Sequence, residues 1–215
     1  MDDLLSALSA HLQEGDDGAV RTLTAEAIAL GVPPSHILDR ALLPAMTAVG
    51  ARFRDREIFL PDVLLVARAM HGAMSILKPA LAAGDVPPAG TVVLGTVLGD
   101  IHDIGKNLVA FMLQGAGFEV VDLGTDVPPD RFVEAAVEHG ASVIGMSALL
   151  TTTMGGMAEV VAALRGRGLA GRIATIVGGA PLSEAFAREI GADAYACDAP
   201  AAVDRIRSLV GRAHA

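Results

Sequence analysis

The first 83 residues carry the hydrophobic spacing of α-helices. Apolar residues recur at intervals of three and four positions in four segments, which lie near residues 3–14, 17–30, 34–54 and 61–83. Pro61 stands where a proline can open the last of these helices at its first turn. The pattern predicts an α-helical four-helix bundle over residues 1–86.

The chain from residue 87 onward has a different pattern. Short runs rich in β-branched residues alternate with stretches of helical character, and these runs are TVVLGTVL, FEVVDL, SVIGMS, RIATIVGG and a weaker DAYAC. Strands that are apolar throughout are typical of a parallel sheet covered by helices on both faces. We therefore predict a flavodoxin-like (Rossmann-like) α/β domain over residues 87–215, with a five-stranded parallel sheet in the order 2-1-3-4-5. The Gly- and Pro-rich residues 84–90 are predicted to be an interdomain linker.

Composition and charge narrow the classes of function. The chain is 52% hydrophobic and 19% charged, which favours a globular fold over disorder. Its formal net charge is -9 and it has no run of Lys or Arg, so we expect no nucleic-acid partner. Its first residues lack the features of a signal peptide, and no run of about 18 uninterrupted apolar residues follows, so we expect no membrane association. The single cysteine, Cys197, favours a reducing cytoplasm, and we expect it to be a buried thiol near strand 5.

The predicted sheet order indicates where to look for a site. In such a sheet, ligands bind beyond the carboxyl ends of the strands, at the switch point between strands 1 and 3. The loops after those strands are residues 99–105 and 147–153, and they hold the densest polar chemistry in the chain. Taken alone, Asp100-x-His102 is most simply a polar loop before a helix that opens at Lys106. A zinc site is disfavoured, because no second His or Cys lies at a useful spacing.

Three separated elements change this interpretation. Asp100-x-His102-x-x-Gly105, Ser147-x-Leu149 and Gly178-Gly179 follow one another at intervals that resemble the cobalamin-binding signature of methionine synthase and of corrinoid methyl carriers. The helical segment VGARFRDREIFLPDVLLVARAM is similar to the helical cap that precedes the cobalamin domain in those proteins. The resemblance covers nearly the whole chain, from about residue 5 to about residue 210. It implies a cobalamin-binding α/β domain preceded by a four-helix-bundle cap domain.

The resemblance also implies the cofactor and its ligand. The cofactor would be cobalamin or a related corrinoid, alternating between methylcobalamin and cob(I)alamin. Its own base would leave cobalt and lie in a channel between strands 1 and 3, while His102 becomes the axial cobalt ligand and gives its other N–H to Asp100. Thr153 occupies the place of a serine that extends this pair into a relay in methionine synthase, and its β-branched side chain leaves the relay geometry open. The predicted catalytic residues are therefore Asp100, His102 and Thr153.

A wider set of residues is implied around the corrinoid. Gly105 would let the loop approach the corrin, and the Gly178-Gly179 pair would let the cofactor tail lie against backbone. Phe53 and Leu60 match side chains that cover the upper corrin face, although helical Phe and Leu residues are usually core residues. Thr152 can equally be a cap of the helix that begins near Met154. The full predicted cofactor-binding set is Gly99, Asp100, Ile101, His102, Asp103, Ile104, Gly105, Ser147, Leu149, Thr151, Thr153, Gly178, Gly179, Phe53 and Leu60.

The function implied by the resemblance is that of a methyl shuttle. Its partners would be a substrate:corrinoid methyltransferase, a corrinoid:pterin or corrinoid:thiol methyltransferase, and a reductive activase. Little activity is expected without them, so the sequence leaves open whether the chain is an enzyme by itself. A cobalamin-dependent sensor or regulator is the alternative, but the chain has no Trp for the cap of such a sensor and no DNA-binding segment. The small subunit of a cobalamin mutase is disfavoured because that architecture has no cap. The methyl donor is not indicated by the sequence.

Overall fold

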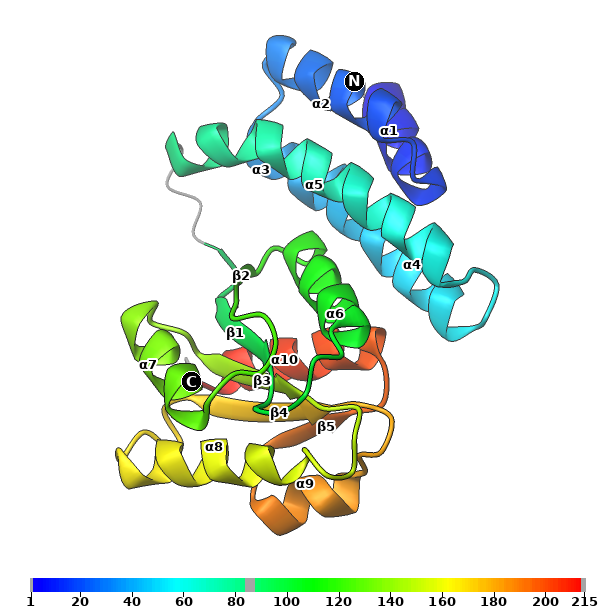
Figure 1. Cartoon of the computed structure of the whole chain (residues 1–215). Helices are drawn as coiled ribbons and strands as arrows, with labels where there is room; N and C mark the ends of the chain where they lie inside the picture. Colours follow the sequence, from blue (N-terminus) through cyan, green and yellow to red (C-terminus); the bar gives the residue numbers. More distant parts are fainter. Residues whose placement is uncertain (1, 84–87, 214–215) are drawn as a thin grey trace. The chain divides into compact units, whose positions relative to one another are not determined.

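A computed structural model of the chain describes residues 2–83 and 88–213 (Figure 1). Two compact units make it up. The helical unit comprises Met1–Pro88 and Gln114–Gly117, and the α/β unit comprises Ala89–Leu113 and Phe118–Ala215. Four residues of the predicted linker, 84–87, lie outside the described residues.

The helical unit contains the helices that the hydrophobic spacing predicts. They are α1 (Asp2–Glu14), α2 (Asp17–Ala29), α3 (Pro34–Ile37), the π-helical turn η1 (Leu38–Leu42), α4 (Leu43–Arg54) and α5 (Leu60–Ala83). The segment predicted as one helix over 34–54 is helical throughout but contains the π-helical turn. Pro44 has no N–H to bond the carbonyl of Arg40, so the regular ladder of hydrogen bonds is interrupted there.

Leucines and methionines fill the core of the helical unit. Leu8 and Leu12 of α1, Leu42 of η1 and Met70 and Leu77 of α5 are among its fully buried side chains. Among the described residues, α5 alone is long and apolar enough to be compared with a membrane span, since residues 60–77 have a mean hydropathy of 1.3. Of this window, 44% is buried inside the structure, as is common for a core helix.

The α/β unit has the predicted strand order. Its elements are β1 (Thr91–Thr96), α6 (Ile104–Gly115), β2 (Glu119–Asp122), α7 (Pro129–Glu138), β3 (Val143–Ser147), α8 (Gly155–Gly166), β4 (Ala174–Gly178), α9 (Glu184–Ile190), β5 (Ala194–Ala196) and α10 (Ala199–Ala213). All neighbouring strands are parallel, and the sheet order is β2-β1-β3-β4-β5. The prediction of a doubly wound five-stranded sheet is confirmed.

Helices cover both faces of this sheet. Figure 1 shows α8 and α9 on one face, and α6 and α10 on the other. Val93, Ile144 and Val177 of the three central strands pack with Phe132 of α7 and Met157 of α8 in one buried cluster. Because successive strand residues point to opposite faces, their neighbours on the strands point toward α6 and α10. That second face holds the cavity described below.

Two local predictions in this unit are wrong. Helix α6 begins at Ile104 and not at Lys106, because the carbonyl of Asp103 already accepts a hydrogen bond of 2.7 Å from the backbone N–H of Asn107. Cys197 is exposed rather than buried, because β5 ends at Ala196 and the cysteine follows the end of a three-residue edge strand.

Candidate functional site

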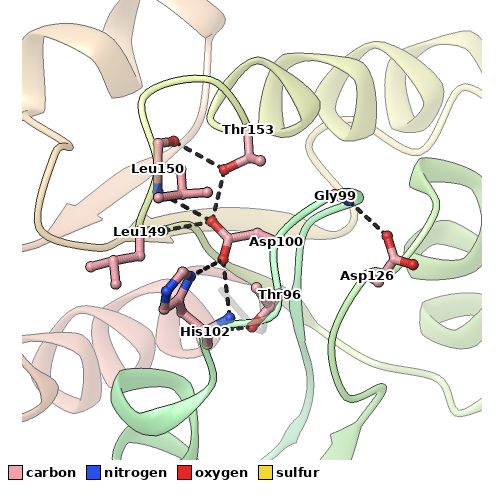
Figure 2. A network of polar contacts seen from close by, with 8 residues as sticks. All are labelled: Thr96, Gly99, Asp100, His102, Asp126, Leu149, Leu150 and Thr153. Atoms are coloured by element: carbon pink, nitrogen blue, oxygen red, sulfur yellow. Dashed lines mark hydrogen bonds and ion pairs between the residues drawn. The ribbon is translucent and has the colours of Figure 1, made fainter.

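The two polar loops meet at the carboxyl end of the sheet. β1 and β3 are neighbours, with Thr96 opposite Ser147 at their ends, so the loops that follow them start side by side. Figure 2 shows the result: Asp100 and His102 of the first loop face Leu149, Leu150 and Thr153 of the second. The structure therefore brings together the three side chains predicted to be catalytic.

Asp100 lies at the centre of this arrangement. Its side chain is completely buried. Oδ1 accepts hydrogen bonds from the backbone N–H of His102, at 3.0 Å, and from Nδ1 of the same residue, at 2.7 Å. Oδ2 accepts from the backbone N–H groups of Leu149, at 2.8 Å, and Leu150, at 3.2 Å, and lies 2.7 Å from Oγ1 of Thr153. Every polar atom of this buried carboxyl group thus has partners.

Thr153 completes the arrangement despite its β-branched side chain. Its Oγ1 lies within reach of two acceptors, Oδ2 of Asp100 at 2.7 Å and the carbonyl oxygen of Leu150 at 3.0 Å. A hydroxyl has one proton to donate, and an ionised carboxylate is the stronger acceptor. Thr153 therefore donates to Asp100. Thr152 makes no cap: helix α8 begins at Gly155 after Met154, without a side-chain capping bond.

These contacts keep Asp100 ionised. Burial raises the pKa of its carboxyl group, but the hydrogen bonds from Thr153 Oγ1, the backbone of His102 and Leu149, and the His102 ring outweigh this effect. The net result is a pKa well below the usual range for Asp. Because an ionised carboxylate only accepts hydrogen bonds, the proton of the neutral His102 ring lies on Nδ1. Nε2 of His102 then carries a free lone pair, on a side chain that is 45% exposed.

We predict a pH-dependent cost for Asp100→Asn in the cofactor-free protein. The amide would turn an N–H₂ group toward buried donors, so the free energy of unfolding should fall by about 2–4 kcal/mol at neutral pH. A lowered pKa in the folded state means that the stabilising contribution of Asp100 is present above about pH 4, its unfolded pKa, and is lost as pH falls further. The difference between the two proteins should therefore shrink below about pH 4 in denaturant titrations. Glu138→Gln, at an exposed position on α7, is the control. A difference independent of pH would contradict this account.

A cavity begins at His102 and extends between the sheet and helices α6 and α10. Its volume is about 640 Å³, within the range of small-molecule sites. The wall includes Leu94 of β1, Val109 of α6, Ile176 of β4 and Ile206 of α10, and it is mostly apolar. All of its lining residues belong to the α/β unit.

Most of the predicted binding residues of the two loops and of the β4 end line this cavity. They are Ile101, His102, Asp103, Ile104, Gly105, Ser147, Leu149, Gly178 and Gly179. Asp100 and Thr153 lie behind His102, and Gly99 and the exposed Thr151 stand on the same two loops without lining the cavity. The side chains of Ile101, Ile104 and Leu149 are exposed, which leaves apolar surface beside His102. Such a surface suits an apolar ligand.

Gly179 and Gly105 are glycines for different reasons. A Cβ on Gly179 would lie 1.9 Å from the carbonyl oxygen of Ala148, and its φ is +144°, so the fold itself requires glycine there. A Cβ on Gly105 would meet no protein atom within 4 Å, and its φ is not in the left-handed region. The fold therefore does not require glycine at 105. Gly105 is instead one of the residues that line the cavity.

The sequence analysis missed a buried cation beside the site. Lys106 is buried at the start of α6, where Nζ lies 2.6 Å from both carboxylate oxygens of Asp122 and 2.7 Å from Oδ1 of Asn107. Nδ2 of Asn107 in turn donates to Oδ2 of Asp103, at 3.0 Å. A positive charge in the first turn of a helix is unfavourable, because the N-terminal end of the helix dipole is itself positive. This position was the one feature of the sequence that could have indicated a carboxylate partner for Lys106.

Two further residues support the first loop and were also missed. Thr96 Oγ1 donates a hydrogen bond of 3.0 Å to the carbonyl oxygen of His102. Asp126, in the loop between β2 and α7, accepts a hydrogen bond of 2.7 Å from the backbone N–H of Gly99 (Figure 2). Nothing in the sequence around either residue distinguishes it from an ordinary strand or loop position.

The two predicted cap residues lie in the helical unit. Phe53 is near the end of α4 and Leu60 opens α5, and both are partly buried. Phe59, between them, is 65% exposed. A role of Phe53 and Leu60 toward a cofactor stays a prediction.

Comparison with known proteins identifies the class of ligand. The chain matches the family described as B12 binding domain over residues 90–206, and a second family of the same description over residues 4–78. Dimethylamine corrinoid protein 3 of Methanosarcina acetivorans is 46% identical over 179 residues, which cover 83% of this chain and 84% of that protein. Trimethylamine corrinoid protein 1 of Methanosarcina mazei is 38% identical over 211 residues, covering 97% and 98%.

Solved structures agree with this result over both units. A chain of the methanol:cobalamin methyltransferase complex from Methanosarcina barkeri superimposes with a TM-score of 0.87 at 31% identity, covering 98% of this chain and 80% of that one. A cobalamin-binding protein from Desulfitobacterium hafniense gives 0.79 at 32% identity, covering 95% and 98%. Fold and site together define a cobalamin-binding protein. The chain belongs to the corrinoid proteins of methyltransferase systems, and its cofactor is cobalamin or a related corrinoid.

The residues of the site fit this cofactor. Among the described residues, no group of three His, Cys, Asp or Glu side chains could hold a bare metal ion. A metal inside a macrocycle has its equatorial ligands already and needs only an axial ligand from the protein. His102 offers one exposed ring nitrogen, and the cavity next to it can take an apolar group of the size of a nucleotide base.

Proposed function

We propose that this protein is a methyl carrier that binds its corrinoid base-off and His-on through Nε2 of His102. It takes a methyl group from a substrate:corrinoid methyltransferase and passes it to a second methyltransferase, which acts on a pterin or thiol acceptor, and a reductive activase restores oxidised cofactor. We place this system in the cytoplasm. The observation that supports the proposal best is the buried Asp100 paired with His102 at the mouth of the cavity.

When bound, a corrinoid supplies a cobalt ion that can accept a methyl group and give it up. Other residues of this chain set the orientation and the tautomer of His102, the proposed axial ligand. Asp100 holds the proton of the His102 ring on Nδ1, which leaves the lone pair of Nε2 for the metal. Thr153 and the backbone of Leu149 and Leu150 hold the Asp100 carboxylate in place. The Asp100 carboxylate, 2.7 Å from Nδ1, would keep the ring of His102 in this orientation whether or not Nε2 binds the metal.

A methylamine is the methyl donor that the relatives favour. Proteins named for dimethylamine are 42–46% identical to this chain. Two proteins named for trimethylamine are 37% and 38% identical, a monomethylamine corrinoid protein 36% and the chain of the methanol complex 31%. We propose dimethylamine as the donor that the partner methyltransferase demethylates. Specificity for the donor then resides in that partner, because the cavity of the α/β unit is assigned to the cofactor.

The test is dependence on a partner. The protein is loaded with cobalamin, kept reduced with a chemical reductant and mixed with dimethylamine, and monomethylamine is measured. We expect none without a methyltransferase and one equivalent per cobalamin when a dimethylamine-specific methyltransferase is added. Turnover by the loaded chain alone would contradict the carrier role. Parallel reactions contain a methyltransferase specific for trimethylamine or for methanol, each with its own methyl donor. Transfer with the methanol enzyme only would overturn the proposed donor and leave the carrier role intact.

A further inference from the structure

The loop that carries Asp100 and His102 is supported from two sides. Because β1 lies between β2 and β3 in the sheet, the loop after β1 is flanked by the loops after both neighbours. The β3 side supplies the donors to Oδ2 of the Asp100 carboxylate. The β2 side supplies Asp126, which Figure 2 shows on the opposite side of the loop from Thr153.

Asp126 holds the backbone on both sides of the Asp100 α-carbon. Its Oδ1 accepts a hydrogen bond of 2.7 Å from the backbone N–H of Gly99, the residue before Asp100. Its own backbone N–H donates a hydrogen bond of 3.0 Å to the carbonyl oxygen of Asp100. One residue thus binds the peptide group between Leu98 and Gly99 and the carbonyl group of Asp100, which lie on either side of the segment from which the buried carboxylate extends.

The backbone conformations at this contact are specialised. Gly99 has a φ of +80° and Asp126 has a φ of +57°, so both residues are left-handed. Among residues other than glycine, Asp and Asn adopt this conformation at the lowest cost. Of the described residues, only Arg56 in the helical unit shares a positive φ without being glycine. The conformation of Asp126 aims both its side chain and its N–H at the loop after β1.

We propose that Asp126 is a positioning residue of the cofactor site: it fixes the backbone of Asp100 and through it the His102 ring. This inference rests on the proposed ligation of cobalt by His102. The carboxylate of Asp100 is bound to the β3 loop through Oδ2, while its backbone carbonyl is bound to the β2 loop through the N–H of Asp126. Loss of the Asp126 side chain frees the N–H of Gly99 and lets the loop shift relative to Leu149 and Leu150, which lengthens the contact with His102 or turns its ring.

Two substitutions separate this role from the others of Asp126. Asp126→Gly keeps the left-handed backbone and the N–H that bonds Asp100, but it removes the side-chain acceptor. Asp126→Asn keeps the backbone preference and an oxygen acceptor for the Gly99 N–H, and removes only the charge. Ala is unsuitable, because it would add backbone strain to the loss of the acceptor.

The readout is the strength of His102 ligation and not methyl transfer. The Co(III) cobalamin-loaded proteins are titrated with cyanide, and displacement of the imidazole is followed by visible absorption. We expect the midpoint for Asp126→Gly to fall about fivefold, which corresponds to about one hydrogen bond, and that for Asp126→Asn to stay within about twofold of the unaltered protein. A purely structural role would lower the thermal midpoint of the apoprotein and leave the cyanide midpoint unchanged.

His102→Ala is measured in parallel, so that the two proposals fail separately. If the unaltered protein and His102→Ala titrate alike, His102 does not ligate cobalt and the proposed function is wrong. If His102 ligates but Asp126→Gly titrates like the unaltered protein, the positioning role of Asp126 is overturned while the ligation stands. Equal losses in the Gly and Asn variants would also overturn it, because the effect would then come from charge and not from the hydrogen bond to Gly99.

Discussion

His102→Ala is expected to abolish the nitrogen ligand of cobalt in the reconstituted protein. Nε2 of His102 is the free nitrogen at the mouth of the cavity, since Nδ1 is occupied by Asp100. In the Co(II) form, the electron paramagnetic resonance spectrum should lose the splitting from an axial nitrogen. Methyl transfer with partners should also fall by about a hundredfold or more, as is common when a ligand or its direct support is removed.

The variant should remain folded, because the His102 side chain is half exposed and contributes little to the core. His139→Ala, at the exposed end of α7, is the matched control and should keep the spectrum of the unaltered protein. An unchanged nitrogen splitting in His102→Ala would mean that another base occupies the axial position, and the assignment of the ligand would be wrong.

Gly105→Leu is expected to stabilise the apoprotein and to weaken its binding of cobalamin. Position 105 lies in the first turn of α6, and no protein atom opposes a Cβ there, so replacing glycine should stabilise the apoprotein by about 0.5–1 kcal/mol. The added side chain, however, occupies the space in front of the cavity. Cobalamin affinity should therefore fall at least about tenfold, which corresponds to the usual cost of inserting atoms into a fitted site.

Gly166→Leu is the control for this prediction. Gly166 ends α8, also has open space in front of a Cβ, and does not line the cavity. Its replacement should leave cobalamin affinity unchanged. Thermal unfolding of the apoproteins and absorbance titrations with cobalamin measure the two effects. Unchanged affinity in Gly105→Leu would show that the cofactor does not approach this turn.

The fold could be predicted because its signals are local and repeated. The three central strands of the α/β unit, β1, β3 and β4, are rich in apolar residues, and the helical unit has regular apolar spacing. The placement of Asp100 and His102 followed from the sheet order, since loops after neighbouring parallel strands must start together. The contact between Thr153 and Asp100 could not be decided, because it depends on the path of the β3–α8 loop and not on residue type.

Contacts between distant polar residues were the part that the sequence did not reveal. The pairs Lys106 with Asp122 and Asp126 with Gly99 join segments that are separate in the chain, and each residue alone is ordinary for its position. The exposure of Cys197 was mispredicted for a related reason. It depends on where a short edge strand stops, and three residues of β5 carry too little pattern to fix that end.

Some of the hydrogen bonds that hold Asp100 cannot be removed by replacing side chains. Two of its donors are the backbone N–H groups of Leu149 and Leu150, which every replacement except proline retains. A scan of this loop by alanine would therefore report Thr153 alone and underestimate what the loop contributes. The same property makes the loop tolerant of sequence drift: its side chains can change while the carboxylate stays held, provided the path of the main chain does not.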